Sequence, residues 1–243
     1  MELIIIFGHG SFLGAVRHNG FIPWDDDIDI AIPRPDYNRL IEIIKKRNRS
    51  LNNNIKFIGF EVNFLDYPFL KIINKNIIIK DKMGWDHNLW VDIFPLDGIP
   101  DVPEKYFKKL RKNLKVYNLL RYSNNNFITE NKLKKLLMPI VKILNYENQI
   151  KKYINDASKY DISVCNYFSD NIWNGGVYRI FKKECLEVST YQFEDIKVKG
   201  FKNYDYVLST LYGEDYMQLP PKEKRYSHNF EAWRINDDKE TLE

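Results

Sequence analysis

Short apolar runs alternate with turn-forming residues over the first hundred residues, a pattern typical of strands mixed with short helices. Strands are predicted at Leu3–Phe7, Asp27–Ile32, Ile55–Phe60, Leu70–Ile73, Ile77–Lys80 and Leu89–Phe94. Helices are predicted at Phe12–Arg17, Pro35–Lys46 and Tyr204–Leu211. The second of these helices begins at a proline, which suits a first helical turn.

The pattern changes to helical spacing between Pro103 and Tyr160. Two apolar stripes are visible there, Leu110, Leu114, Tyr117 and Leu120, and then Leu136, Leu137, Ile140 and Leu144. After about Asp161 the chain returns to short strands and turns. We therefore predict one α/β (α+β) domain over residues 1–243, with a catalytic core at 1–100, a helical insertion at 101–160 and a C-terminal part at 161–243.

Charge is distributed unevenly along the chain. The net charge is +4, yet residues 101–160 hold 14 Lys plus Arg and 5 Asp plus Glu, so this segment carries +9 and the remainder −5. Such a basic segment suits a polyanion or a membrane surface, although a solvated helical face explains it equally simply. No apolar run reaches the ~20 residues of a membrane span. The two cysteines are too few for a disulfide framework, so we expect a cytoplasmic protein, possibly at the inner face of the membrane.

The run Asp25-Asp26-Asp27-Ile28-Asp29 is the first candidate for chemistry. On a strand, Asp27 and Asp29 point to the same face, where their charges repel unless a cation lies between them. Mg²⁺, or Mn²⁺ in its place, binds such carboxylates together with substrate phosphates. By the same alternation Asp25 is a possible further ligand, whereas Asp26 faces away.

A third carboxylate is expected from a neighbouring strand. Asp92 is the best candidate because it is the acid within the apolar strand of LWVDIF, where a charge needs a cation or donor nearby. Asp97 is predicted instead to be a turn residue before Gly98.

Upstream of the acids, Gly10-Ser11 follows a predicted strand and opens a predicted helix. A glycine at that point lets backbone approach a phosphate, and the helix N-terminus supplies N–H groups and positive potential. Gly-Ser or Asp-x-Asp alone is a weak signal. Their combination, about 15 residues apart, is typical of the nucleotidyltransferase fold, with a mixed sheet core flanked by helices.

The run GSFLGAVRHNGFIPWDDDIDIAIPRPDY, with the later VDIFPLDGIP and LYGEDYMQLPPKEKR, resembles the LicD family, whose relatives include fukutin and fukutin-related protein. One departure is His9, which stands where small residues are common. The resemblance implies a metal-dependent enzyme that moves a phospho-alcohol from a CDP-activated donor to a glycan or glycolipid precursor. Phosphocholine from CDP-choline is the first expectation, and ribitol phosphate from CDP-ribitol is the alternative.

The resemblance also implies roles for individual side chains. Asp27, Asp29 and Asp92 would be catalytic and hold the metal, and Gly10 and Ser11 would cradle the diphosphate. Candidates for substrate binding are Arg17, Lys71, Trp24, Arg225 and His228. Each of these five has a plainer alternative: a salt bridge for Arg17, an outward-facing lysine for Lys71, core packing for Trp24, and surface positions for the last two.

Two other functions remain open at this level. A nucleotidyltransferase that moves NMP from an NTP to a small molecule, protein or RNA would share the fold motif. A glycan-binding module with a Ca²⁺ site would share the acids but needs no phosphate cradle. We expect no nucleic-acid partner, and peripheral membrane contact is possible through residues 101–160.

Overall fold

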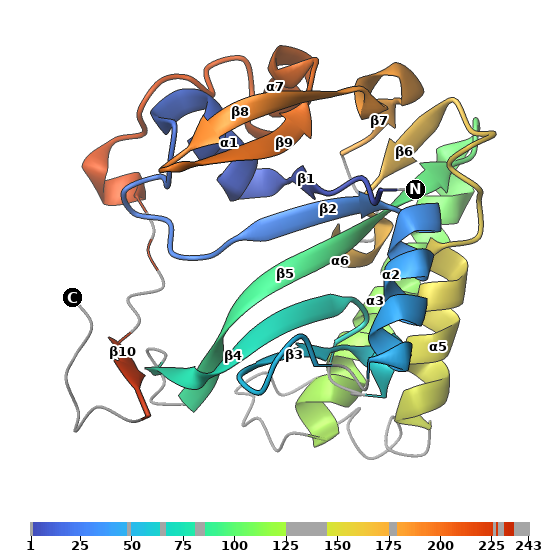
Figure 1. The fold of residues 1–243 in the computed structure, drawn as a ribbon. Helices are drawn as coiled ribbons and strands as arrows, with labels where there is room; N and C mark the ends of the chain where they lie inside the picture. The colour runs from blue at the N-terminus through green and yellow to red at the C-terminus, as the bar shows by residue number, and fades with distance from the viewer. Residues whose placement is uncertain are drawn as a thin grey trace.

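A long mixed sheet organises the fold, with strands in the order β1-β2-β5-β4-β10 (Figure 1). The computed structural model describes residues 2–47, 50–63, 67–80, 86–124, 145–174, 179–225, 227 and 231–235. The strands of this path are β1 (Ile6–Phe7), β2 (Asp29–Pro33), β5 (Asp86–Ile99), β4 (Leu70–Lys80) and β10 (Glu231–Arg234). Off the path, β3 (Ile55–Ile58) pairs with β4, β6 (Tyr167–Ser169) with β5, and β7 (Phe181–Lys182) with β6.

The centre of the sheet is the parallel pair β2 and β5, in which Asp29 is the register partner of Asp92. The strands β4 and β5 are antiparallel and much longer than the sequence pattern predicted. The two predicted strands within residues 70–80 are one strand, interrupted by a register shift between Asn74 and Ile78. A β-bulge of this kind breaks the period-two pattern without ending the strand, which is why the sequence suggested two.

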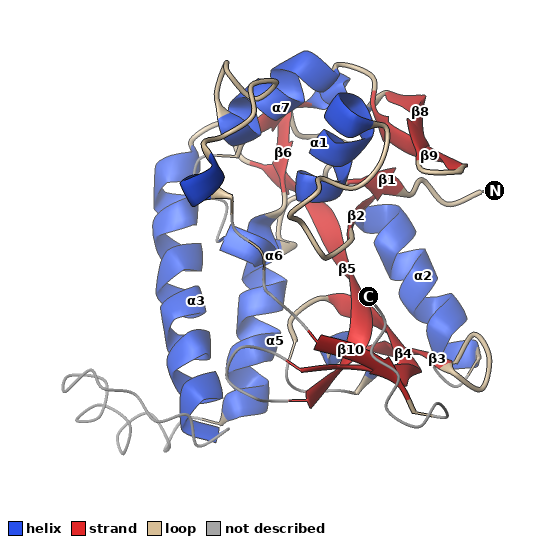
Figure 2. Cartoon of the chain, turned by 90° about the vertical axis from the view of Figure 1, so that its left-hand side faces the viewer, coloured by secondary structure: helices blue, strands red, loops and turns tan. Residues whose placement is uncertain are grey.

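Helices cover both faces of the sheet (Figure 2). On one face α2 (Arg34–Lys46) buries Tyr37, Ile41 and Ile44 against apolar side chains that include Ile93. On the other face α3 (Pro103–Asn124) and α5 (Tyr146–Ala157) pack around Phe94. Because successive side chains of a strand alternate between faces, two neighbouring residues of β5 support the two helical layers. This confirms the predicted mixed sheet flanked by helices.

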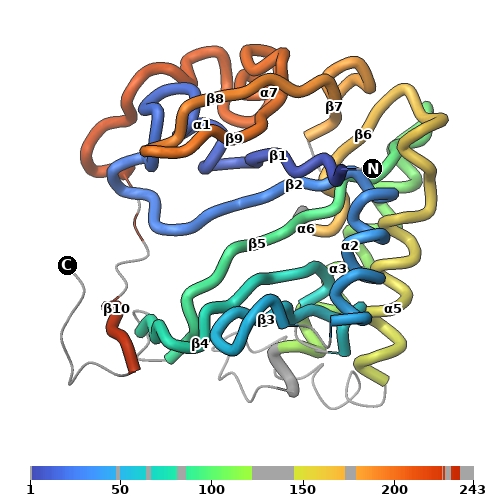
Figure 3. Tube along the Cα trace, viewed as in Figure 1, coloured from blue at the N-terminus to red at the C-terminus, as the bar shows by residue number. Residues whose placement is uncertain are grey.

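A second layer lies above the sheet in Figure 3, where the hairpin of β8 (Val188–Phe193) and β9 (Ile196–Phe201) runs beside α1 (His9–His18) and α7 (Tyr204–Tyr212). Phe12 of α1 meets Tyr191 and Phe201 of the hairpin edge to face, at 5.4 and 5.6 Å between ring centroids. A side chain at Gly200 would come within 2.3 Å of the Phe12 ring, so the close approach of helix and hairpin requires glycine. Short helical turns are α6 (Asn171–Asn174), η1 (Phe60–Val62), η2 (Lys183–Leu186) and η3 (Lys222–Lys224).

One prediction about a carboxylate is wrong. Asp97 is not a turn residue, because β5 continues to Ile99 and the Asp97 side chain is completely buried. Arg34 donates two hydrogen bonds to it, from Nε at 2.6 Å and from Nη2 at 2.7 Å. This bidentate pair ties the start of α2 to β5 and compensates the buried charge.

The basic segment is only partly covered by the structure. The first predicted apolar stripe lies on α3, whereas the second, at residues 136–144, lies outside the described residues. Within the described residues, no helix combines the length and apolar character needed to span a bilayer.

Candidate functional site

A cavity of about 650 Å³ opens between the start of α1, the segment before β2 and the segment that follows α7. Its lining includes Gly10, Arg17, Trp24, Asp25, Asp27 and Asp29. Residues separated by about two hundred positions therefore meet at one site, because α1 and the segment that follows α7 both lie in the upper part of Figure 1. These six residues were all predicted for the site, whereas Ser11, Lys71, Asp92 and Arg225 are not part of the lining.

The start of α1 has the geometry of an anion site. Gly8 precedes the helix in an extended conformation and caps no N–H with a side chain. A side chain at Gly10 would lie 2.3 Å from Oδ2 of Asp25, so a carboxylate oxygen already approaches the backbone where a phosphate was predicted. A helix N-terminus favours such a negative group through its N–H donors and its dipole. The requirement for glycine at position 10 is therefore explained by close approach of an oxyanion.

The side chain of Ser11 contacts the acidic segment. Its buried hydroxyl accepts a hydrogen bond from the backbone N–H of Asp29 at 2.9 Å. The neighbouring N–H of Gly8 donates to the carbonyl of Asp29 at 3.0 Å. These two bonds fix α1 against the first residue of β2, so the Ser11 side chain positions the acidic segment.

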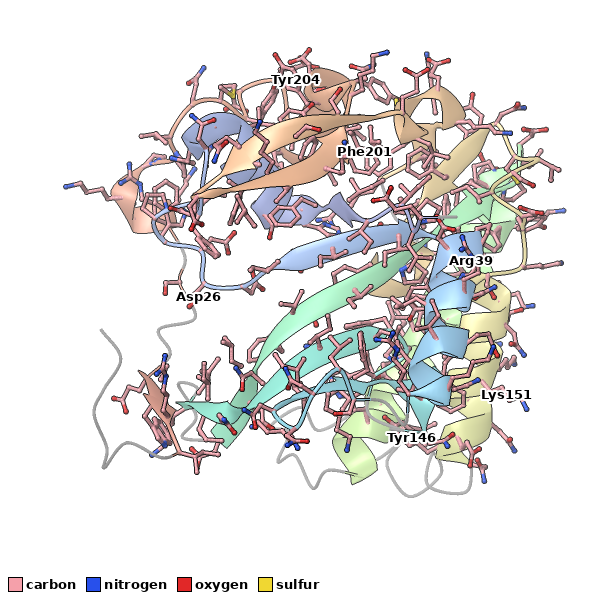
Figure 4. The ribbon with its side chains drawn as sticks, viewed as in Figure 1. Asp26, Arg39, Tyr146, Lys151, Phe201 and Tyr204 are labelled. Atoms are coloured by element: carbon pink, nitrogen blue, oxygen red, sulfur yellow. The ribbon has the colours of Figure 1, made fainter. Side chains whose placement is uncertain are left out.

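The acidic run is arranged by a loop as much as by a strand. Because β2 begins only at Asp29, the prediction that Asp25 and Asp27 alternate along a strand is wrong. Both side chains nevertheless line the cavity with Asp29. Asp26 is not part of the lining; it accepts a hydrogen bond from the Ser227 hydroxyl at 3.3 Å and lies on the outer loop at the left of Figure 4.

The charge on Asp29 is poorly compensated. Burial is the main cause that raises the pKa of Asp29 to about 7; the charge of His9 opposes this shift, and the charges of Asp27, Asp92 and Asp25 contribute to it. A carboxyl group that is half protonated near neutral pH is a common feature of functional sites. The group is therefore poised to bind a cation or to exchange a proton.

Asp92 lies next to the cavity without lining it. Its Oδ1 is 2.7 Å from Nζ of Lys71, which stands opposite it in the β4–β5 register. Lys71 is buried at 8% exposure, with its ammonium 4.6 Å from the Tyr67 ring and 4.7 Å from the Trp90 ring. The expected cation beside Asp92 is thus a lysine, and the outward-facing alternative for Lys71 is wrong.

Two arginines meet at Trp24, a half-buried residue of the cavity lining. The guanidinium carbon of Arg225 lies 4.5 Å from the ring centroid, and that of Arg17 lies 5.9 Å away. Nη1 of Arg17 also donates to the backbone carbonyls of Tyr216 and Gln218, at 2.7 and 3.3 Å. Arg17 therefore joins α1 to the segment that follows α7, and among the described residues it forms no salt bridge, which was the alternative role considered for it. His228 lies outside the described residues.

Sequence reasoning missed several residues of the site. His9, Arg179 and Tyr212 also line the cavity, and Asp170 contacts His9. No sequence motif identifies Arg179 or Asp170, because both lie in the part of the chain for which the sequence predicted only short strands and turns. The unusual histidine before Gly10 was the one available signal.

The fit of a metal ion depends on what the substrate contributes. Within the described residues, no three His, Cys, Asp or Glu side chains lie close enough together to form a metal-binding group. Mg²⁺ however is usually held by one or two carboxylates, with phosphate oxygens and water completing the octahedron. Asp27 and Asp29 suit that arrangement, because both line the cavity and their negative charges repel each other unless a cation lies between them.

Comparison with known proteins agrees with this geometry. Residues 5–113, which contain β1, α1, β2 and β5, match the family model described as LicD/FKTN/FKRP, nucleotidyltransferase domain. The chain is 27% identical over 231 residues to the lipopolysaccharide cholinephosphotransferase LicD of Haemophilus influenzae, covering 92% of this chain and 86% of that protein. It is 32% identical over 93 residues to an uncharacterized protein of Rickettsia prowazekii, covering 33% of this chain and 35% of that one. The predicted resemblance to the LicD family is therefore confirmed, by the family model over residues 5–113 and by the Haemophilus relative over most of the chain.

Proposed function

We propose that this protein is a metal-dependent phosphotransferase that moves phosphocholine from CDP-choline to a cell-surface glycan or glycolipid precursor. The observation that carries the proposal is the meeting of the α1 N-terminus with three carboxylates in one cavity. Support comes from the likeness to a lipopolysaccharide cholinephosphotransferase over nine-tenths of the chain. Lipopolysaccharide and teichoic acid precursors are both of the proposed acceptor class.

In the proposed reaction, an acceptor hydroxyl attacks the phosphorus that carries the alcohol. A new P–O bond forms, the bond to the CMP phosphate oxygen breaks, and CMP leaves with the electron pair of that bond. Transfers of this kind need alignment and charge neutralisation more than covalent help from the protein. The first turn of α1 would bind the donor phosphates, which replace the Asp25 carboxylate near Gly10.

The hydroxyl proton would pass to a cavity carboxylate. Asp29 is the proposed acceptor among the described acids, because its carboxylate lines the cavity together with the N-terminus of α1. Asp92 is less available because Lys71 contacts it at 2.7 Å. Asp92 would instead support Asp29 from the adjacent strand.

Asp27 and Asp29 would hold Mg²⁺ or Mn²⁺, with Asp25 as a further ligand once it leaves Gly10. When bound, the ion would neutralise charge on the phosphates and orient them. Trp24 would then stack on the cytosine base. A neutral ring suits it better than a choline cation, because two guanidinium groups already lie at its ring.

The direct test is CMP release from CDP-choline with Mg²⁺ and a lipid-linked or soluble glycan acceptor, followed by chromatography. We expect Asp27→Ala and Asp29→Ala to lose at least about a hundredfold in rate, as removal of groups that stabilise transition-state charge does. Asp26→Ala is the matched control, since its side chain lies outside the cavity lining. Full activity in either of the first two variants would show that the catalytic site is elsewhere.

The donor is tested separately. CDP-ribitol replaces CDP-choline if the transferred alcohol is a polyol, and ATP, CTP, GTP and UTP test NMP transfer to a small molecule, protein or RNA. The rise in melting temperature with each nucleotide and Mg²⁺ ranks the nucleotides without an acceptor. At equal concentration, the ligand with the lower Kd for the folded protein stabilises it more. Preference for any NTP over both CDP-alcohols would contradict the proposed reaction class.

We also propose that the protein is cytoplasmic and that its basic segment, residues 101–160, contacts the inner face of the membrane. The lysines of α3 at positions 105, 108, 109, 112 and 115 are exposed, although Lys109 pairs with Asp156 at 2.5 Å. Flotation with anionic liposomes should recover the protein at low salt and lose it after Lys108→Glu and Lys112→Glu. No flotation of the wild type at low salt would exclude this contact.

A further inference from the structure

A chain of three side chains crosses the cavity wall beside Gly10. Nε2 of His9 lies 2.9 Å from Oδ2 of Asp170, and Nη1 of Arg179 lies 3.2 Å from Nδ1 of His9. Asp170 is almost fully buried, at 3% exposure, whereas His9 and Arg179 both line the cavity. The order from interior to cavity is therefore carboxylate, imidazole and guanidinium.

The hydrogen bonds of this chain have one consistent assignment. An arginine side chain is always charged and can only donate, so Nδ1 of His9 must accept from Arg179. Nε2 then carries the proton and donates to Asp170. The buried carboxylate thus fixes the tautomer of His9, and His9 in turn directs Arg179.

The backbone supports a built arrangement. His9 has φ of 43°, in the left-handed region that non-glycine residues seldom adopt. A conformation of this kind is strained and persists where surrounding contacts determine it. Here the contacts are the hydrogen bond to Asp170 and the edge of the His9 ring on Phe94, at 5.3 Å between centroids.

The other cavity arginine differs from Arg179. Arg17 uses Nη1 on two backbone carbonyls and Nε on His18. Among the described residues, His9 is the hydrogen-bond partner of Arg179, which leaves the N–H groups on Nε and Nη2 for a ligand. Arg179 lies in the same cavity as Gly10 and Asp29, so its charge stands beside the helix N-terminus and the carboxylates.

We propose that Arg179, held by His9 and Asp170, binds the diphosphate of the donor at the N-terminus of α1. The inference rests on the proposed function only in taking a diphosphate as ligand, which CDP-alcohols and NTPs share. Arg179 contacts the substrate in this proposal, and His9 and Asp170 are positioning residues. The planar guanidinium matches phosphate oxygens, and its attachment to His9 reduces the freedom that binding would otherwise remove.

The test is calorimetric titration of inorganic pyrophosphate with Mg²⁺ into the full chain, which needs neither nucleoside nor turnover. We expect Arg179→Gln to weaken binding at least tenfold, with Arg179→Lys in between. His9→Ala should weaken binding severalfold, and His9→Gln should recover part of it because an amide can accept from Arg179 and donate to Asp170. Lys199→Gln on the exposed β8–β9 hairpin is the charge-matched control and should bind as wild type.

A double-mutant cycle separates positioning from general loss of structure. If His9 acts through Arg179, adding His9→Ala to Arg179→Gln should weaken binding no further, whereas independent effects would add. Thermal melts confirm that each variant is folded. The proposal is overturned if Arg179→Gln binds pyrophosphate within twofold of wild type, if the wild type binds none, or if the effects add. CMP release that persists with unchanged pyrophosphate binding in Arg179→Gln would overturn this inference and leave the proposed function standing.

Discussion

Nζ of Lys71 lies 2.7 Å from Oδ1 of Asp92, and the exposed fractions of the two side chains are 10% and 9%. The pair is the end of a charged row that runs across the sheet, from Lys71 on β4 through Asp92 on β5 to Asp29 on β2. Burial lowers the pKa of Lys71, although Asp92 opposes that shift. The lysine thus neutralises the inner acid of the row and leaves Asp29 for the cavity.

Replacing Lys71 by methionine should destabilise the fold by about 3–5 kcal/mol, because it leaves the Asp92 charge buried and unpaired. Urea denaturation at pH 7.5 measures the change. The double variant Lys71→Met with Asp92→Leu should recover much of the loss, since an apolar pair of similar volume is often as stable as a buried ion pair. Equal stability of the single variant and wild type would mean that the pair contributes nothing.

Substitution of the two buried acids of β5, Asp92 and Asp97, should affect turnover differently. Asp97→Asn should destabilise the protein by about 3 kcal/mol, because Arg34 then loses its bidentate partner in a buried site and keeps only the longer contact of Nη1 with Glu61 at 3.6 Å. Its kcat per folded molecule should stay within about threefold of wild type, since Asp97 is not part of the cavity lining. Asp92→Asn should lose both stability and turnover.

The kcat per folded molecule is measured by chromatographic CMP release, corrected for the folded fraction of each variant. The exposed Asp101→Asn serves as control for the loss of one carboxylate near the end of β5. Parallel losses of turnover in the Asp97 and Asp92 variants would contradict the separation.

Stability should fall with rising pH because of Asp29. Its pKa rises from 3.8 to about 7 on folding, so between these values the folded state holds the proton that the unfolded state has released. That contribution is present below about pH 4, falls as pH rises, and is gone above about pH 7, with a total of at most about 4 kcal/mol. Asp29→Asn should therefore be more stable than wild type at pH 8.5 without divalent ions, and nearly equal at pH 4.5.

Denaturant midpoints at the two pH values, with EDTA, measure this difference. Addition of Mg²⁺ at pH 8.5 should raise the stability of wild type more than that of the variant, if Asp29 is a metal ligand. A variant less stable than wild type at pH 8.5 would show that the Asp29 carboxylate is well compensated.

A methyl group at Gly10 should impair the site without unfolding the protein. The added carbon would lie 2.3 Å from the Asp25 carboxylate, which is the end of a movable side chain and can retreat. We expect Gly10→Ala to raise the KM for the donor at least tenfold, because the methyl group occupies the space of the phosphate. Gly8→Ala is the matched control, with its methyl 3.5 Å from Cβ of Ala31, an ordinary contact. Equal KM values in the two variants would place the phosphate elsewhere.

Local sequence patterns predicted several residues that line the cavity and much of the secondary structure around them. A strand, a glycine and a helix before a run of acids predict α1 and β2, although not the residue at which β2 begins, because strand and helix periods and close backbone approach are local properties. The same pattern identified Asp27 and Asp29 as cavity residues, and burial of Asp92 beside a cation followed from its apolar neighbours. The same run of residues carries the resemblance to the LicD family.

The residues that reach this site from distant parts of the sequence could be identified only from the tertiary fold. Arg179 and Asp170 reach the N-terminus of α1 from a region without a motif, and Arg225 reaches Trp24 from the C-terminal segment. Asp97 looked like a turn residue because local sequence cannot show that Arg34, on another element, meets it in the core. Such pairings depend on which strands lie next to each other, and sheet order is a long-range property that local spacing does not encode.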